Sequence, residues 1–201
     1  MLILNNFTYE QNEMIDQVTG YFIMPKYTEN LDQYLQRQSK IDSQTVLKII
    51  VQLIEAFDIV HASGRTFNDL KPQNIMVEHD KDGQLYIVLI DFGFSDKFLT
   101  AQGDHITNSE LKDSFQGNIL FSSYDQMDFK FTSRKDDLYS LVLMMLYMLN
   151  DLDVPGLDKM SIVNVKNDAR QMYRLLKQFK KNFTLQEMSC FIKLQNGDDC
   201  I

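Results

Sequence analysis

The stretch Asp69-Leu70-Lys71-Pro72-Gln73-Asn74 decides how this chain is interpreted, together with Asp91-Phe92-Gly93, which follows after a short hydrophobic run. A long segment of apolar periodicity precedes the first stretch, and a pattern typical of a β-hairpin separates the two. Asp-Phe-Gly alone is a weak signal, because a strand followed by Asp, an aromatic residue and Gly also makes an ordinary turn. The conjunction of both stretches at this spacing is a strong signal.

Both stretches carry side chains suited to phosphoryl transfer, which requires an in-line hydroxyl, neutralised phosphates and metal ions held by oxygen ligands. Asp69 would accept or orient the proton of the attacking hydroxyl, and Lys71 would reach the transferring phosphate as a compact positive charge. Asn74 offers a carbonyl oxygen and Asp91 a carboxylate, a pairing suited to Mg²⁺ that bridges phosphates. Gly93 would let the backbone turn sharply after Asp91.

Apolar periodicity along the chain predicts an α+β protein with one compact core. A long helix should begin at Ser43, its predicted N-cap, and end near Gly64, with an apolar stripe of Val46, Ile49, Ile50, Leu53, Ile54, Phe57 and Val60. Residues 94–123 are aperiodic and polar, which in a compact domain indicates a functional loop. Shorter patterns predict strands over 2–8, 20–24, 74–77 and 85–90, and helices over 30–38, 137–150, 169–181 and 185–194.

Composition limits the kinds of partner that this chain can have. A formal net charge of -8 on 201 residues argues against a nucleic-acid surface or an anionic-membrane surface. We interpret the basic face of the helix over 169–181, which carries Arg174, Lys177, Lys180 and Lys181, as a solvated surface. Because the only two cysteines, Cys190 and Cys200, lack a metal-ligand or disulfide-framework spacing and no apolar run is long enough to span a membrane, we expect an intracellular protein, cytoplasmic or nuclear.

These motifs resemble those of protein kinases, and within them those of the casein kinase one family. Val60-His61-Ala62-Ser63-Gly64 is similar to the segment before the kinase catalytic loop, and Phe67-Asn68-Asp69 occupies the place of its His-Arg-Asp. The segment from Phe115 to Ser123 resembles the casein kinase one substitute for the usual Ala-Pro-Glu region. Ser133 to Leu141 is similar to that family's stretch at the start of the central helix. The general resemblance covers almost the whole chain.

The resemblance implies a partial protein kinase domain over residues 1–201, with a mainly helical C-lobe, short β-hairpins and most of the N-lobe missing. Residues 1–24 would be a remnant of the N-lobe strands, residues 25–28 the hinge, and residues 29–201 a C-lobe that is truncated at its end. The implied activity is that of a serine/threonine protein kinase, with ATP and Mg²⁺ as cofactors and proteins as substrates.

The resemblance also implies roles for residues outside the two motifs. Asp137 would brace the catalytic loop through its backbone amides. Met24 would stand at the gatekeeper position, and Pro25 and Tyr27 would line the adenine site of ATP. Proline is tolerable there because that position is expected to offer only its carbonyl.

Several departures from the family pattern leave a second interpretation open. Asn68 replaces the arginine that would clamp a phosphorylated activation segment, and Leu120 stands where casein kinase one enzymes carry an arginine of an anion-binding site. The sequence also lacks a glycine-rich loop and a strand lysine, which position the phosphates of ATP. The alternative is therefore a catalytically inactive, kinase-derived binding or scaffold module, with a partner that covers the exposed edge of the small lobe.

Overall fold

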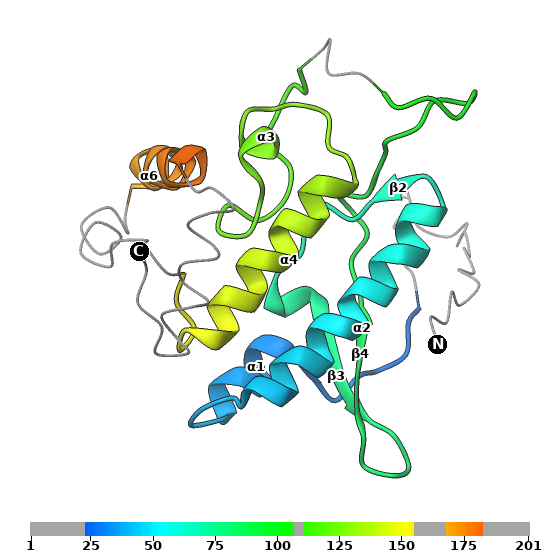
Figure 1. Ribbon diagram of the computed structural model, residues 1–201, viewed down its shortest axis with the longest axis vertical. Coiled ribbons are helices and arrows are strands. Elements are labelled where there is room, and N and C mark those ends of the chain that lie inside the picture. The colour runs from blue at the N-terminus through cyan, green and yellow to red at the C-terminus, as the bar shows by residue number, and fades with distance from the viewer. Residues whose placement is uncertain (1–22, 107–110, 155–167, 183–201) are drawn as a thin grey trace, which may run out of the picture.

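The computed structural model describes residues 23–106, 111–154 and 168–182. Two long helices, α2 (Ser43–Ala62) and α4 (Arg134–Leu149), lie side by side in the centre of the molecule (Figure 1). The other elements surround this pair: β1 (Glu29–Asn30), α1 (Leu31–Arg37), β2 (Arg65–Thr66), the 3₁₀ turn η1 (Pro72–Asn74), β3 (Ile75–His79), β4 (Leu85–Leu89), β5 (Asp96–Lys97), α3 (Tyr124–Met127) and α6 (Ala169–Asn182). The predicted α+β class is confirmed.

The apolar stripe of α2 forms a large part of the core. Six of its seven predicted members are buried: Val46, Ile49, Ile50, Leu53, Phe57 and Val60. The prediction for Ile54 was wrong, because this side chain is 48% exposed. Ile54 falls on a neighbouring row of the helix surface together with Leu47 and Val51, which are also exposed, since residues three and four apart share one face.

The helices start within three residues of the predicted positions, and α6 starts at the predicted residue. The N-cap of α2 is Asp42 and not Ser43, because the Asp42 carboxylate accepts the N–H of Thr45 at 3.0 Å. The central helix α4 begins at Arg134, three residues before the predicted start at Asp137, and the N–H of Ser133 donates to the carboxylate of Asp136 at 2.8 Å. A carboxylate is favourable in this first turn, where the helix dipole is positive.

Two small antiparallel sheets support the loop between α2 and β3. Strands β3 and β4 form the predicted hairpin, in which Val77 is opposite Ile87, and β1 pairs with the other edge of β3. Strand β2, which follows α2, pairs with β5 in the same way, so that Thr66 is opposite Asp96. The β2–β5 pair therefore lies at the start of the loop from residue 67 to residue 74, and the β3–β4 hairpin lies at its end.

Helix α6 packs beside α3 at one side of the molecule (Figure 1). The prediction of a fully solvated basic face on this helix was wrong for Lys180, which is 3% exposed. Its ammonium donates to the backbone carbonyl of Ile119 and to the hydroxyl of Ser122. Burial lowers the pKa of Lys180 to about 7, because a charged amine loses its hydration in the protein interior.

Part of the predicted secondary structure lies outside the described residues: the strand over 2–8, most of the strand over 20–24 and the helix over 185–194, together with both cysteines. Residues 23 and 24, where the second of these strands was predicted to end, are described and do not belong to a strand. None of the helices in the described part of the chain combines the length and the apolar composition that crossing a membrane requires.

Candidate functional site

Asp137, in the first turn of α4, anchors the loop from residue 67 to residue 74 by hydrogen bonds. Its carboxylate accepts the backbone N–H of Phe67 and that of Asn68, both at 2.8 Å, which are contacts of the kind that the resemblance implies. The imidazole of His61, near the end of α2, is also 2.8 Å from this carboxylate. Because Asp137 is 1% exposed, these hydrogen bonds form in a dry environment and fix the loop to the core.

Asp69, Lys71 and Asn74 come together on this loop. Lys71 Nζ lies 2.6 Å from Asp69 Oδ2, and Asn74 Nδ2 donates to the same oxygen at 2.8 Å and to the Asp69 carbonyl at 3.0 Å. The second carboxylate oxygen, Asp69 Oδ1, is buried and has no hydrogen-bond partner. Burial of an oxygen without a hydrogen-bond partner costs free energy, so Asp69 Oδ1 is an unsatisfied acceptor that can receive a hydrogen bond.

The Asp91-Phe92-Gly93 segment joins the same cluster from the end of β4. The N–H of Ile90 donates to the carbonyl of Asn74 at 3.0 Å, which brings Asp91 next to Asn74. The Phe92 ring packs edge-on against Phe67, with 5.1 Å between the ring centroids. Gly93 donates its N–H to Asp91 Oδ1 at 3.2 Å, and the left-handed φ at this turn belongs to Asp91 and not to Gly93.

Two residues of the site adopt the left-handed backbone region that non-glycine residues rarely enter. The φ angle is 68° at Asn68 and 62° at Asp91. At Asn68 the surrounding contacts explain how this conformation is held: its side-chain amide donates to the carbonyl of Phe94 at 2.8 Å, and its own N–H is bound by Asp137. Such conformations persist only where neighbouring structure enforces them, and they gather at functional sites.

Sequence reasoning missed the residues that connect this loop to the segment after residue 115. The side-chain amide of Gln126, in α3, donates to the carbonyl of Asn68 at 2.7 Å and to that of Gln116 at 2.6 Å. Gly117 lies against the same carbonyl, because a Cβ at this position would be 2.4 Å from Asn68 O. No local pattern points to Gln126, whereas the isolated Gly117 is the kind of residue that signals a close backbone approach.

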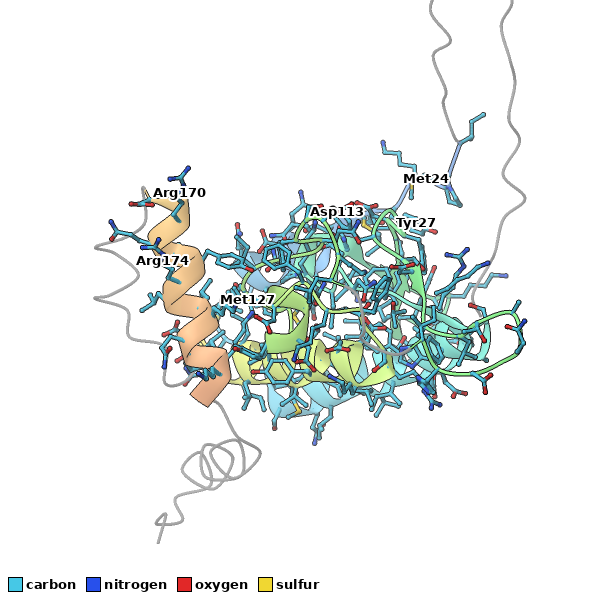
Figure 2. The ribbon with its side chains drawn as sticks, turned by 90° about the horizontal axis from the view of Figure 1, so that it is seen from above. Met24, Tyr27, Asp113, Met127, Arg170 and Arg174 are labelled. Carbon is cyan, nitrogen blue, oxygen red and sulfur yellow. The ribbon has the colours of Figure 1, made fainter. Side chains whose placement is uncertain are left out.

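The segment before β1 holds the three residues predicted to line an adenine site. Met24 and Pro25 are exposed, whereas Tyr27 is half-buried, and Figure 2 shows Met24 and Tyr27 at the same edge of the molecule. Burial raises the pKa of the Tyr27 phenol, and the nearby Tyr86 and Glu78 act in the same direction. Thr28, the next residue, is held to β3 by a hydrogen bond of 3.0 Å to the Glu78 carboxylate.

The fold and this cluster define a protein kinase domain, and comparison with known proteins agrees. Residues 8–193 match the sequence model of the protein kinase domain. This chain therefore belongs to the protein kinase family.

Individual relatives extend the comparison. The chain is 27% identical over 169 residues to a probable casein kinase I homolog of Encephalitozoon cuniculi, a match that covers 84% of this chain and 50% of the relative. It is 29% identical over 124 residues to a probable serine/threonine-protein kinase of Dictyostelium discoideum, with 61% and 25% covered, and 27% identical over 111 residues to a casein kinase 1-like protein of Oryza sativa, with 54% and 16% covered. The chain thus spans half or less of these relatives.

Proposed function

We propose that this chain is part of a serine/threonine protein kinase of the casein kinase one type, which transfers the γ-phosphate of ATP to hydroxyl groups of protein substrates. The observation that carries the proposal is the hydrogen bonding of the two carboxylate oxygens of Asp69. One of its carboxylate oxygens is held by Lys71 and Asn74, and the other is buried without a partner. A substrate hydroxyl is the donor that this free oxygen would receive.

In this proposal each polar side chain of the cluster has its own role. Asp69 orients the attacking hydroxyl and accepts its proton, and Lys71, 2.6 Å from Asp69, offers a positive charge to the transferring phosphate. Asp137 and Gly93 support the site: the Asp137 carboxylate fixes the loop, and Gly93 donates its N–H to the Asp91 carboxylate. Met24, Pro25 and Tyr27 would line the adenine of ATP.

Asn74 and Asp91 are suited to Mg²⁺ by the atoms that they leave available. Asp69 accepts both hydrogen bonds of the Asn74 amide nitrogen, so the carbonyl oxygen of Asn74 is its atom for a cation. Asp91 is exposed and uses Oδ1 for the N–H of Gly93. No group of three or more His, Cys, Asp and Glu side chains gathers among the described residues, and Mg²⁺ in phosphate sites needs only one or two carboxylates plus the phosphates. When bound, the ion would neutralise charge on the phosphates.

A binding module without catalysis is the second candidate, and the exposure of apolar side chains near the site favours it. Ile23 is 69% exposed, Met24 is 44% exposed and Phe92 is 40% exposed. Exposed large apolar side chains favour contact with another protein surface. In this case a partner would cover the edge where a small lobe is expected, and the chain would compete for kinase substrates. For both candidates we infer an intracellular protein, cytoplasmic or nuclear, without nucleic-acid or membrane binding.

Thermal unfolding with nucleotide separates the two candidates. ATP with Mg²⁺ at about 100 times its Kd should stabilise the folded chain by about 2.7 kcal/mol and raise its melting temperature. Asp91→Asn should remove most of this shift, whereas Asp82→Asn, an exposed carboxylate in the turn between β3 and β4, should leave it unchanged. A melting curve that does not respond to saturating nucleotide would contradict ATP binding by this chain and favour the binding module.

A further inference from the structure

The surface of α2 that faces away from the core carries three large apolar side chains. Leu47 is 57% exposed, Val51 is 52% exposed and Ile54 is 48% exposed. Because they are four and three residues apart, they form one row along the helix, which we call the outer row. Figure 1 shows α2 beside α4 on the face of the molecule that is turned toward the viewer. Apolar side chains that are contiguous, and not scattered singly, mark a candidate contact surface.

The spacing of the outer row suits contact with another helix. Intervals of four and three residues are those of the apolar seam between two paired helices. Leu47 and Ile54 are seven residues apart, which is about 10.5 Å along the helix axis. Asp58, the next position in the same series, is exposed and charged, so the apolar seam ends at Ile54. The outer row therefore matches a short apolar stretch of a second helix.

Two charged side chains beside the outer row restrict what this second helix can present. Lys48 and Glu55 are exposed, and each directly follows a member of the row, so both lie on the same flank of it. They are seven residues apart, whereas ion pairs on one helix join residues three or four apart. The two charges are therefore available to a partner. A complementary helix must carry an acid opposite Lys48 and a base opposite Glu55.

A second copy of α2 in antiparallel orientation meets this requirement. A two-fold axis beside Val51 places the outer rows of the two copies on each other, with Val51 of one copy next to Ile54 of the other. The same axis brings Lys48 of each copy beside Glu55 of the other, because these residues lie three and four positions from Val51. In a parallel pair, identical charges would lie at the same level and repel each other.

From this complementarity we propose that α2 forms the interface of a homodimer, in which the outer rows of two copies pack antiparallel and are flanked by pairs of Lys48 with Glu55. Burial of the apolar side chains supplies affinity, and the charge pairs fix the orientation. The outer row includes no residue of the loop from residue 67 to residue 74 or of the Asp91-Phe92-Gly93 segment. The dimer therefore does not depend on the proposed phosphoryl transfer.

Sedimentation equilibrium of the full chain tests the proposal. The average mass should rise from 23.6 kDa toward twice this value as the protein concentration increases. Val51→Asp, at the centre of the interface, should raise the Kd of the dimer by at least about 10-fold, because it buries two carboxylates beside the axis. Leu111→Asp is the matched control: Leu111 is 65% exposed, lies outside α2 where it pairs with Lys130, and should leave the Kd unchanged.

Charge reversal tests the orientation of the two copies. Lys48→Glu and Glu55→Lys should each raise the Kd by about 3-fold to 10-fold, because each creates two contacts between like charges. The double variant should return the Kd to that of the unmodified chain. An equimolar mixture of the two single variants should form a mixed dimer more tightly than either variant forms its own, since every contact then joins opposite charges. Unfolding of a variant cannot produce either restoration.

Other results would overturn the proposal. A chain that remains at 23.6 kDa at all concentrations forms no dimer, and its outer row is then free or covered by another part of the chain. A dimer that Val51→Asp leaves unchanged uses a different surface. A dimer that Val51→Asp dissociates, but in which neither the double variant nor the mixture restores association, does not have the antiparallel arrangement.

Discussion

The side-chain amide of Gln126 donates to the backbone carbonyl of Asn68 at 2.7 Å, across 58 residues of sequence. The same nitrogen reaches Gln116 O at 2.6 Å, so one side chain ties the Asp69 loop to the segment that follows residue 115. Gln126 is 5% exposed and its bond to Asn68 O is buried, so removal of this amide would leave the Asn68 carbonyl without a donor and with little access to water. Gln126 therefore contributes, together with the close contact at Gly117, to the geometry of the two segments.

Replacing Gln126 by leucine keeps the size of the side chain and removes both donated hydrogen bonds. We expect the free energy of unfolding to fall by about 2 to 4 kcal/mol, because the buried carbonyl of Asn68 and the partly buried carbonyl of Gln116 lose their donor. Urea unfolding followed by circular dichroism measures the loss. Gln44→Leu, at an exposed position in the first turn of α2, is the control and should change stability by less than about 0.5 kcal/mol. Equal effects of the two substitutions would contradict the bridging role.

Gly117 tests the close contact between the same two segments. Its φ of 114° disfavours any side chain, and an added Cβ would lie 2.4 Å from Asn68 O and 2.5 Å from Gln126 Nε2. Gly103 is the matched control, because it also has a positive φ, 87°, but no atom lies within 4 Å of its Cβ position. Gly117→Ala should lower the free energy of unfolding by at least about 2 kcal/mol more than Gly103→Ala.

The comparison of these two alanine variants separates steric contact from backbone strain. If both lower the melting temperature equally, the cost comes from the positive φ alone, and the contact between Gly117 and Asn68 is not tight in solution. A larger loss for Gly117→Ala shows that the two segments are packed without spare room.

Asp137 should be among the residues of the site that are most sensitive to substitution. Asp137→Ala leaves the buried N–H groups of Phe67 and Asn68 without an acceptor and also removes the partner of His61. We expect a loss of about 3 to 5 kcal/mol in the free energy of unfolding. Hydrogen exchange should show faster exchange of the Phe67 and Asn68 amides than in the unmodified chain. Asp113→Ala, at an exposed carboxylate, should change neither quantity.

Lys180 gives a prediction for the dependence of stability on pH. Burial lowers the pKa of this ammonium to about 7 in the folded chain, whereas an unfolded lysine titrates at about 10.4. Between these values the unfolded chain binds more protons, so Lys180 makes the free energy of unfolding rise with pH in this window. Below about pH 7 the lysine is charged in both states and its burial lowers stability fully.

The variant Lys180→Met removes this titration. As the pH rises from about 7 to about 10, the free energy of unfolding of the unmodified chain should therefore increase relative to that of the variant. This relative increase should be a few kcal/mol, the size expected from the difference between the folded and unfolded pKa of Lys180. Lys181→Met, the exposed neighbour on α6, should give a difference that does not change with pH. Parallel stability curves for the Lys180 variant and the unmodified chain would contradict the burial of a charged amine.

Features with a local signal were predicted well from the sequence. The apolar residues of α2 follow the period of a helix, and those of β3 and β4 follow the pattern of strands. The two motifs around Asp69 and Asp91 have a recognisable spacing. The sequence did not reveal which row of α2 contains Ile54, because two adjacent apolar rows satisfy the same period. It also did not distinguish Asp42 from Ser43 as the cap, since both side chains can accept the required hydrogen bond.

Contacts between distant segments could not be predicted in this way. Lys180 has the sequence neighbourhood of a surface lysine, and its burial follows only from the carbonyl of Ile119 that α6 covers. The bond from Gln126 to Asn68 joins segments whose separation depends on the whole fold. The positive φ of Asn68 is likewise imposed by its partners Asp137 and Phe94 and not by its own preference.

The bond between Phe67 and Asp137 spans 70 residues, and this has a consequence for the order in which the protein folds. Helix α2 and the loop that follows it leave the ribosome long before α4, so the loop has no acceptor for its amides during most of synthesis. Closing so long a loop is slow, and it is favourable only once α2 and α4 can dock. Refolding experiments should therefore show helix formation before the Phe67 and Asn68 amides become protected, which makes the loop from residue 67 to residue 74 one of the last parts of the domain to mature.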